Sequence, residues 1–307
     1  MSAMRTVVVA TLWTIVMAGA AMPARVVAAE PVAAFTADGG RYYGPIVDGR
    51  REGHGRVEWD NGARYEGEFR AGFFHGKGRL RMATGDVYEG SFVNGVQTGH
   101  ARLRMTDGAS YVGAIRDGAF DGRGRYDDGH GNVYEGQFKA GLFHGRGRST
   151  GPIGVYDGEY VRGQPHGMGE LRHRDGRRYR GLFARGLFDG KGRLEEPDGS
   201  VFEGEFVDGE PKGQARITAS DGSRYQGDVR GGLPHGLGEL RLPNGDVYTG
   251  QFARGEFDGP GALAYSRPLA DGRVLDRGLW VRGRLQSSEP DPGATARNAI
   301  APPPRPQ

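Results

Sequence analysis

The chain contains no cysteine, and this absence removes several classes of function at once. Without thiols there are no disulfides, no thiolate nucleophiles and no zinc sites built from cysteine. Apolar residues are also scarce, at 36% of 307 residues, so a conventional closed core of matching size is not expected. The formal net charge of +3 is too small to indicate a nucleic-acid-binding protein.

Long apolar runs are absent except at the N-terminus. There, Arg5 precedes an apolar stretch from Val7 to Met17, and small residues follow from Ala18 to Ala21. This order is typical of a secretory signal peptide, so we assign residues 1–29 to one and expect an exported protein, periplasmic or secreted. The alternative is an uncleaved membrane anchor over residues 6–22, which approaches the shortest length that spans a bilayer.

Glycine, in contrast, is abundant at 57 residues, and it recurs with a fixed period. The stretch from Tyr65 to Gly78 reads Tyr-Glu-Gly-Glu-Phe-Arg-Ala-Gly-Phe-Phe-His-Gly-Lys-Gly, and it returns along the chain. With the first aromatic residue as position zero, ten units start at Tyr42, Tyr65, Tyr88, Tyr111, Tyr134, Tyr156, Tyr179, Phe202, Tyr225 and Tyr248. The spacing is 23 residues, apart from one 22-residue step into Tyr156. Such a period indicates a repeat array.

The repeat fixes the predicted organisation of the chain. Residues 30–40 form a linker, and residues 41–283 form the array, which ends in a degenerate eleventh unit near Asp276. Residues 284–307 are rich in proline and hold little that could be buried, so we expect a disordered tail.

Each unit has the pattern of a β-hairpin. Small or apolar residues alternate with acids from Tyr65 to Phe69, and a second alternation begins at Gly78. Asp-Gly and Asn-Gly pairs, such as Asn94-Gly95 and Asn61-Gly62, supply the positive φ that tight turns need. The predicted fold is therefore all-β: an elongated, twisted, single-layer antiparallel sheet of tandem hairpins.

Glycine fills positions two, seven and eleven in all ten units. Position seven belongs to a turn, whereas position two lies in the middle of a strand, where glycine normally weakens the strand. A neighbouring group must therefore exclude a Cβ at position two, and we expect the rings at positions zero and four to fold over it. We predict that Gly136→Val destabilises the protein far more than Gln137→Val.

The aromatic residues at positions zero and four form a row on one face of the predicted sheet. Nothing else in the chain is large or apolar enough to cover that row, so we expect an exposed face that binds a helix, a peptide segment or a second copy of the chain. The predicted partner-binding residues are Tyr88, Phe92, Tyr111, Tyr134, Phe138, Tyr156, Tyr160, Tyr179 and Phe183.

Position fourteen is arginine in seven units, on the opposite face. Position one on that face is mostly acidic, as at Glu66 and Glu89, so cross-strand ion pairs that keep the face soluble are the favoured reading. The alternative is association with anionic lipid at a membrane surface. The lipid-facing candidates are Arg79, Arg102, Arg125 and Arg148.

Four histidines, His75, His144, His166 and His235, fill position ten. Neighbouring units lie roughly 9.6 Å apart, whereas zinc ligands lie about 2.0–2.3 Å from their metal, so a turn role with bonds to the backbone is favoured over metal binding. We predict no catalytic, cofactor-binding or metal-binding residues and therefore no cofactor.

The pattern Tyr-x-Gly-x-Phe-x-x-Gly-x-x-His-Gly-x-Gly, written from Tyr65 to Gly78 and from Tyr134 to Gly147, resembles the MORN repeat (membrane occupation and recognition nexus). The resemblance covers about 240 residues in ten units. It implies an elongated sheet of hairpins with scaffolding, dimerisation or membrane-associated roles, and it implies no activity of its own. The expected function is thus a non-enzymatic exported scaffold that binds a protein partner or itself, without nucleic acid.

Overall fold

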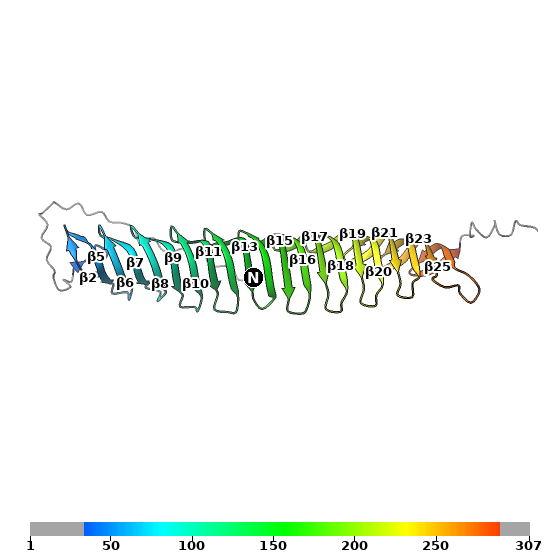
Figure 1. Ribbon diagram of the computed structural model, residues 1–307, viewed down its shortest axis with the longest axis horizontal. Helices are drawn as coiled ribbons and strands as arrows, with labels where there is room; N and C mark the ends of the chain where they lie inside the picture. Colours follow the sequence, from blue (N-terminus) through cyan, green and yellow to red (C-terminus); the bar gives the residue numbers. More distant parts are fainter. Residues whose placement is uncertain (1–33, 289–307) are drawn as a thin grey trace, which may run out of the picture. The chain divides into compact units, whose positions relative to one another are not determined.

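A computed structural model describes residues 34–288, and none of these residues is in a helix. Their strands pair in antiparallel fashion, and 23 of them belong to one sheet that does not close on itself. The chain divides after His166 into two compact units. Within each unit the hairpins lie side by side (Figure 1), which confirms the predicted all-β class and the hairpin repeat.

The strands follow the repeat along the chain. Those of the first unit are β1 (Ala34–Phe35), β2 (Arg41–Tyr43), β3 (Ile46–Val47), β4 (Arg50–Arg51), β5 (Gly53–Glu58), β6 (Arg64–Arg70), β7 (Phe73–Arg81), β8 (Val87–Val93), β9 (Val96–Arg104), β10 (Ser110–Arg116), β11 (Ala119–Asp127), β12 (Val133–Lys139), β13 (Leu142–Thr150) and β14 (Gly154–Val161). Strand β15 (Gln164–His173) crosses the division. Those of the second unit are β16 (Arg178–Ala184), β17 (Leu187–Glu195), β18 (Val201–Val207), β19 (Glu210–Thr218), β20 (Arg224–Arg230), β21 (Leu233–Arg241), β22 (Val247–Ala253), β23 (Glu256–Ala264), β24 (Leu275–Val281) and β25 (Arg284–Ser288).

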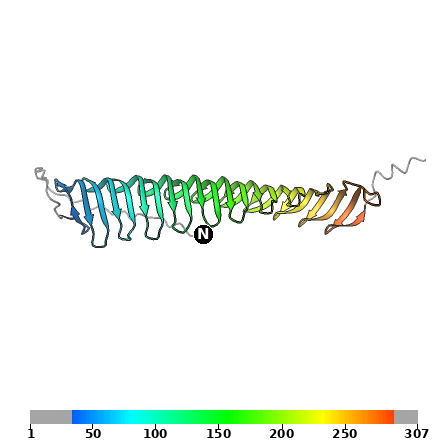
Figure 2. The same cartoon turned by 60° about the horizontal axis from the view of Figure 1, so that its bottom comes forward.

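Two kinds of turn join these strands, one kind at each end of the strands (Figure 2). At the hairpin tips both central residues have positive φ, as at Ala71 (51°) and Gly72 (84°), which is the pattern of a two-residue type I′ turn. In the turn that joins one repeat to the next, glycine has positive φ and its neighbours do not. Gly62, for example, has φ of 84° and donates its N–H to the Trp59 carbonyl at 3.0 Å. Both predicted turn positions are therefore confirmed.

A β-bulge interrupts the hairpins. In the hairpin of β12 and β13, Gly136 pairs with Gly147, but the next residue, Gln137, pairs with His144. Strand β13 therefore carries extra residues at this point, and one of them, Gly145, has φ of 58°. Because a positive φ is costly for any residue with a Cβ, position eleven is filled by glycine.

The mid-strand glycine at position two is explained by what surrounds it. A Cβ on Gly67 would lie 2.5 Å from the Gly78 Cα of the paired strand and 2.6 Å from the Tyr65 hydroxyl. That hydroxyl crosses the glycine pair and donates to the Glu68 carbonyl at 2.9 Å. The expectation that the ring at position zero folds over this glycine is confirmed. The ring at position four is not among the atoms nearest to such a Cβ. The close backbone contact is instead with the glycine at position thirteen on the paired strand.

The strands extend past both predicted ends of the array. Strand β1 lies within the predicted linker and pairs with β2, and β25 lies within the predicted tail and pairs with β24. The boundary predicted at residue 283 is therefore wrong, because residues 284–288 complete the hairpin of the degenerate eleventh unit. The predicted signal peptide or anchor (1–29) and residues 289–307 of the predicted tail lie outside the described residues.

Candidate functional site

The aromatic residues at positions zero and four form a closely packed layer, which we call the ring layer. Tyr65 stacks on Phe74 of the same hairpin with ring centroids 3.7 Å apart. Phe69 and the next unit's Phe92 meet the Tyr65 ring edge to face, at 5.1 and 5.3 Å. Edge-to-face and offset stacking are the favoured geometries of aromatic pairs, so the layer adds stability beyond its buried area.

The ring layer is buried, and this corrects the expectation of an exposed aromatic face. All nine predicted partner-binding residues are at most 4% exposed. The rings are Tyr88, Phe92, Tyr111, Tyr134, Phe138, Tyr156, Tyr160, Tyr179 and Phe183. The cause is local, because in five hairpins a phenylalanine at position nine, across the turn, stacks on the tyrosine of position zero. In this structure the nine rings form the core and do not present a binding surface.

The signal that could have predicted this cover is the residue type at position nine. It is phenylalanine in half of the units, and the described stacks on the tyrosine at position zero all have centroids 3.7 Å apart. These phenylalanines are Phe74, Phe120, Phe143, Phe188 and Phe257. In the first repeat of the array, which starts at Tyr42, position nine is Arg51. Its guanidinium carbon lies 5.9 Å from the Tyr42 ring centroid.

We call the face of the sheet that carries the ring layer the inner face. Its accessible part lies over the ring layer. Phe74 and Phe143 are partly exposed there, and each has a further aromatic neighbour from the preceding repeat. Trp59 lies 6.4 Å from Phe74, and Tyr126 lies 6.4 Å from Phe143, measured between centroids. These four partly exposed rings form two pairs on the inner face of the first unit, three repeats apart.

The arginines of position fourteen lie on the other side of the strands, which we call the outer face. Arg79 faces Glu66 and Glu89 in register, and its side chain lies 3.4 Å from the Glu89 carboxylate. In the second unit Arg193 forms an ion pair with Glu203. The predicted cross-strand pairs are therefore present, although exposed pairs contribute only about 0.2–1 kcal/mol each. Lipid contact by Arg79, Arg102, Arg125 and Arg148, which are all exposed, stays a prediction.

The side chains at position ten lie close to the hairpin tips. Glu52 accepts the Ala71 backbone N–H at 2.7 Å, and Asp121 accepts that of Ala140 at 3.4 Å, so acids here bind the tip of the next hairpin. The hairpin of β12 and β13 contains one histidine, His144, which faces Gln137 in register. Within residues 34–288 no three potential metal ligands from histidine, aspartate and glutamate gather.

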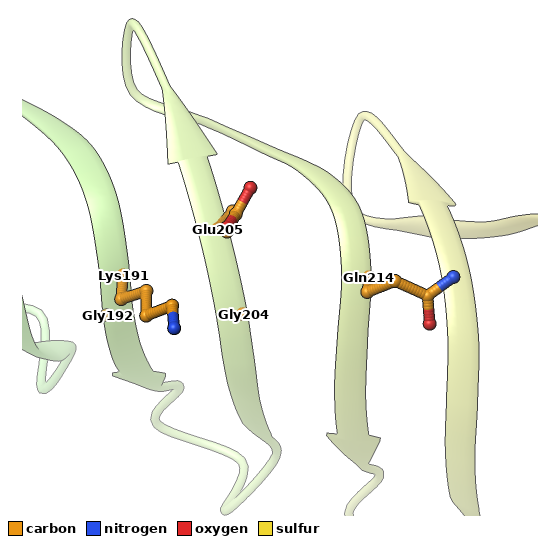
Figure 3. Close-up of a pocket in the computed structure, with 5 residues that line it drawn as sticks. All are labelled: Lys191, Gly192, Gly204, Glu205 and Gln214. Atoms are coloured by element: carbon orange, nitrogen blue, oxygen red, sulfur yellow. The ribbon is translucent and has the colours of Figure 1, made fainter.

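A shallow hollow lies on the outer face of β17 to β19 in the second unit (Figure 3). Its floor is the glycine pair Gly192 and Gly204, and its rim carries Lys191, Glu205 and Gln214. The three long side chains do not converge on a common point in Figure 3. The Gln214 amide instead donates to Asp228 on the next strand, so no ligand site is assigned to this hollow.

A family model of the MORN repeat matches the chain in ten consecutive segments. These segments are residues 42–64, 65–87, 88–110, 111–133, 134–155, 156–176, 179–201, 202–224, 225–247 and 248–266. No curated protein matches the chain. No helix within residues 34–288 has the length and apolar character needed to cross a membrane.

Several solved structures show a weaker likeness. The TCP10 domain of Danio rerio CPAP is 15% identical, with a TM-score of 0.36 over 70% of this chain and 96% of that one. The same domain in complex with a peptide of Danio rerio STIL is 16% identical, with a TM-score of 0.28 over 81% and 99%. The SAS-4 (dCPAP) TCP domain of Drosophila melanogaster, in complex with a proline-rich motif of Ana2 (dSTIL), is 14% identical, with a TM-score of 0.25 over 65% and 90%. Values this low do not extend the binding partners of those domains to this chain.

Proposed function

The chain belongs to the MORN-repeat family, and from this premise we propose that it is a non-enzymatic scaffold that binds a segment of another protein through its inner face. The observation that supports the proposal is that partly exposed aromatic residues lie over the buried ring layer. In the first unit they form two pairs, Trp59 with Phe74 and Tyr126 with Phe143. Aromatic side chains are enriched at protein interfaces because they bury a large area at a small cost in conformational entropy.

The architecture favours an extended partner. Tyr65 and Tyr134 are already covered by Phe74 and Phe143, so the fold does not need a partner to bury its core. The two pairs of partly exposed rings, Trp59 with Phe74 and Tyr126 with Phe143, are three repeats apart, or roughly 29 Å along the sheet. A helix or strand long enough to reach both pairs would bury an aromatic group at each of them.

Site-specific photo-cross-linking tests this proposal. The aromatic cross-linker p-benzoylphenylalanine replaces Trp59 or Tyr126, whose ring size it approaches, in the full chain expressed in its native cells. We expect both positions to give the same cross-linked protein, identified by mass spectrometry, because both rings are partly exposed on the inner face.

The matched control places the same cross-linker at Val93, which is 49% exposed next to a hairpin tip and outside the inner face. We expect the partner to be absent or several-fold weaker there. If Val93 yields that protein as strongly as Trp59 and Tyr126, or if the two inner positions yield no common protein, the inner face is not the docking surface.

We further propose that the scaffold is exported, supported by Arg5, the apolar run from Val7 to Met17 and the small residues after it. N-terminal sequencing of the protein from native cells is expected to find a chain that begins between residues 21 and 30. A chain that retains residues 1–20 and fractionates with membranes would instead identify an anchored protein.

A further inference from the structure

The outer face of the first unit carries an excess of positive charge from β7 to β13. At repeat positions twelve, fourteen and sixteen, and at the residues of β8, β10 and β12 that face these positions, nine outward side chains are lysine or arginine and only three are acidic. The basic residues are Lys77, Arg79, Arg81, Arg102, Arg104, Arg123, Arg125, Arg146 and Arg148, and the acids are Glu89, Asp127 and Glu135. We call this surface the basic strip.

The centre of the basic strip is strand β10, where the outward residues within the strip, Ser110, Val112 and Ala114, are uncharged. Val112 is 37% exposed there, and in register it faces Arg102 on β9 and Arg125 on β11. Arg125 lies 3.7 Å from Asp127. Arg102 and two further arginines, Arg104 and Arg123, have no acidic partner within 4.0 Å among the described residues. Exposed guanidinium groups without partners are available to an anionic ligand.

The excess of charge is not a general property of the repeat. At the same positions of β16 to β23 in the second unit there are seven basic residues, Arg178, Arg180, Lys191, Arg193, Arg216, Arg224 and Arg241, and five acids, Glu195, Glu203, Glu205, Asp228 and Glu239. Several of these pair with acids, as Arg193 does with Glu195 and Glu203 and Arg178 with Glu170. The same repeat positions thus carry nearly balanced charge in one unit and a marked excess in the other.

We propose that the basic strip binds an acidic segment of a second protein, one in which glutamate or aspartate alternates with small apolar residues. Acidic side chains of such a segment would meet the arginines, and its apolar side chains would lie against Val112. In a segment that crosses the strands, successive contacts with Arg102, Val112 and Arg125 would lie about 4.8 Å apart, from one strand to the next.

The dimensions of the strip favour a single peptide over a membrane or a nucleic acid duplex. Seven strands span about 29 Å, and positions twelve to sixteen span about 13 Å along each strand. Acids bound the strip at both ends, with Glu66 and Glu68 on β6 and Asp157 and Glu159 on β14. A broader anionic surface would lie against these acids as well, whereas an extended segment of about nine residues fits between them.

This site is distinct from the proposed function, since the basic strip lies on the face opposite the ring layer. An apolar segment on the inner face and an acidic segment on the outer face would not compete. The first unit would then hold two proteins of different chemistry at once.

Fluorescence anisotropy with a defined probe tests the proposal. The probe is a labelled twelve-residue peptide in which glutamate alternates with valine and serine, and the protein is the full chain. The strip variant is R102Q/R104Q/R123Q/R125Q. The control variant K191Q/R193Q/R216Q/R241Q removes the same number of charges from the matching repeat positions of the second unit.

We expect the strip variant to bind the peptide at least about tenfold more weakly than the wild type, and the control variant to change affinity less than about threefold, because only the strip concentrates unpaired cations. Wild-type affinity should fall steeply between about 50 and 300 mM salt, as screening shortens the range of exposed charges. A peptide with lysine in place of glutamate should not bind. Both variants should melt with the wild type, since all eight substitutions are on exposed side chains.

Equal losses in the two variants would overturn the proposal. So would a wild-type protein that binds phosphatidylserine-containing vesicles or duplex DNA at about 150 mM salt more tightly than the peptide, since the strip would then serve an anionic surface of another class.

Discussion

Replacing Gly136 by valine is expected to lower the free energy of unfolding by about 3–5 kcal/mol, the sum of overpacking and of a lost buried hydrogen bond. A Cβ at this position would lie 2.5 Å from both the Gly147 Cα and the Tyr134 hydroxyl. The two strands must separate, or the hydroxyl must leave the Gln137 carbonyl to which it donates at 2.8 Å. Thermal or urea unfolding followed by circular dichroism measures the loss.

The control for this prediction is the neighbouring substitution Gln137→Val. The Gln137 side chain is on the outer face and exposed, so its replacement should change stability by less than about 1 kcal/mol. Gly147→Ala is a second comparison. It should cost less than Gly136→Ala, because two units already hold alanine at position thirteen, at Ala101 and Ala215, whereas no unit departs from glycine at position two. Equal melting temperatures for Gly136→Val and Gln137→Val would refute this explanation of the glycine.

The protein is expected to lose its fold between about pH 10 and pH 12. Burial raises the pKa of Tyr88, Tyr179 and Tyr248 from the ordinary value of 10.0 to about 12, and burial raises the pKa of Tyr134 in the same direction. Each of these hydroxyls donates to the carbonyl of position three, so an ionised phenolate would place a negative charge against a carbonyl oxygen.

The direction of the pH effect follows from proton binding. Above pH 10 the unfolded chain releases tyrosine protons that the folded chain still holds, so the free energy of unfolding falls as pH rises. The stabilisation is complete below pH 10 and is lost as pH rises through the folded-state pKa. A difference of about two pKa units corresponds to about 2–3 kcal/mol for each tyrosine, and several together exceed the roughly 5–15 kcal/mol that a domain holds. Circular dichroism and tyrosinate absorbance should therefore change together.

Tyr134→Phe separates this ionisation from general alkaline damage. The variant lacks the hydrogen bond to Gln137, so at pH 7 it should be less stable by about 1 kcal/mol. It should also lose less stability than the wild type between pH 9 and pH 12, because one group that must ionise is gone. The array already contains a unit of this kind, with Phe202 at position zero. Parallel losses in wild type and variant over that pH range would contradict the assignment.

Much of the fold can be predicted from the sequence because its determinants are local. The alternation from Tyr65 to Phe69 predicts a strand, and β6 covers it. Pairs such as Asn94-Gly95 predict turns, and both residues have positive φ. A meander of hairpins needs only contacts between neighbours in the chain, so a correct reading of one unit predicts the others.

The burial of the ring layer could not be predicted in the same way. It depends on the bend at the β-bulge and on the contact between Tyr134 and Phe143, which alternation within a single strand does not show. Alternation alone predicts that the rings form one exposed row. The residues predicted to bind a partner are therefore residues of the buried core. The charge excess around Val112 was missed for a related reason, since it appears only when the outward residues of several strands are compared in register.

The connections between hairpins vary in length without disturbing the pairing. The step into Tyr156 is one residue short, yet Gly147 and Gly158 still face each other. A ten-residue connection separates β23 from β24, and there Gly261 still faces Gly278. Alignment thus comes from the strands and not from the linkers that join them. Evolution, or an engineer placing an epitope or a fluorophore, can therefore lengthen these connections while the periodic architecture on either side is preserved.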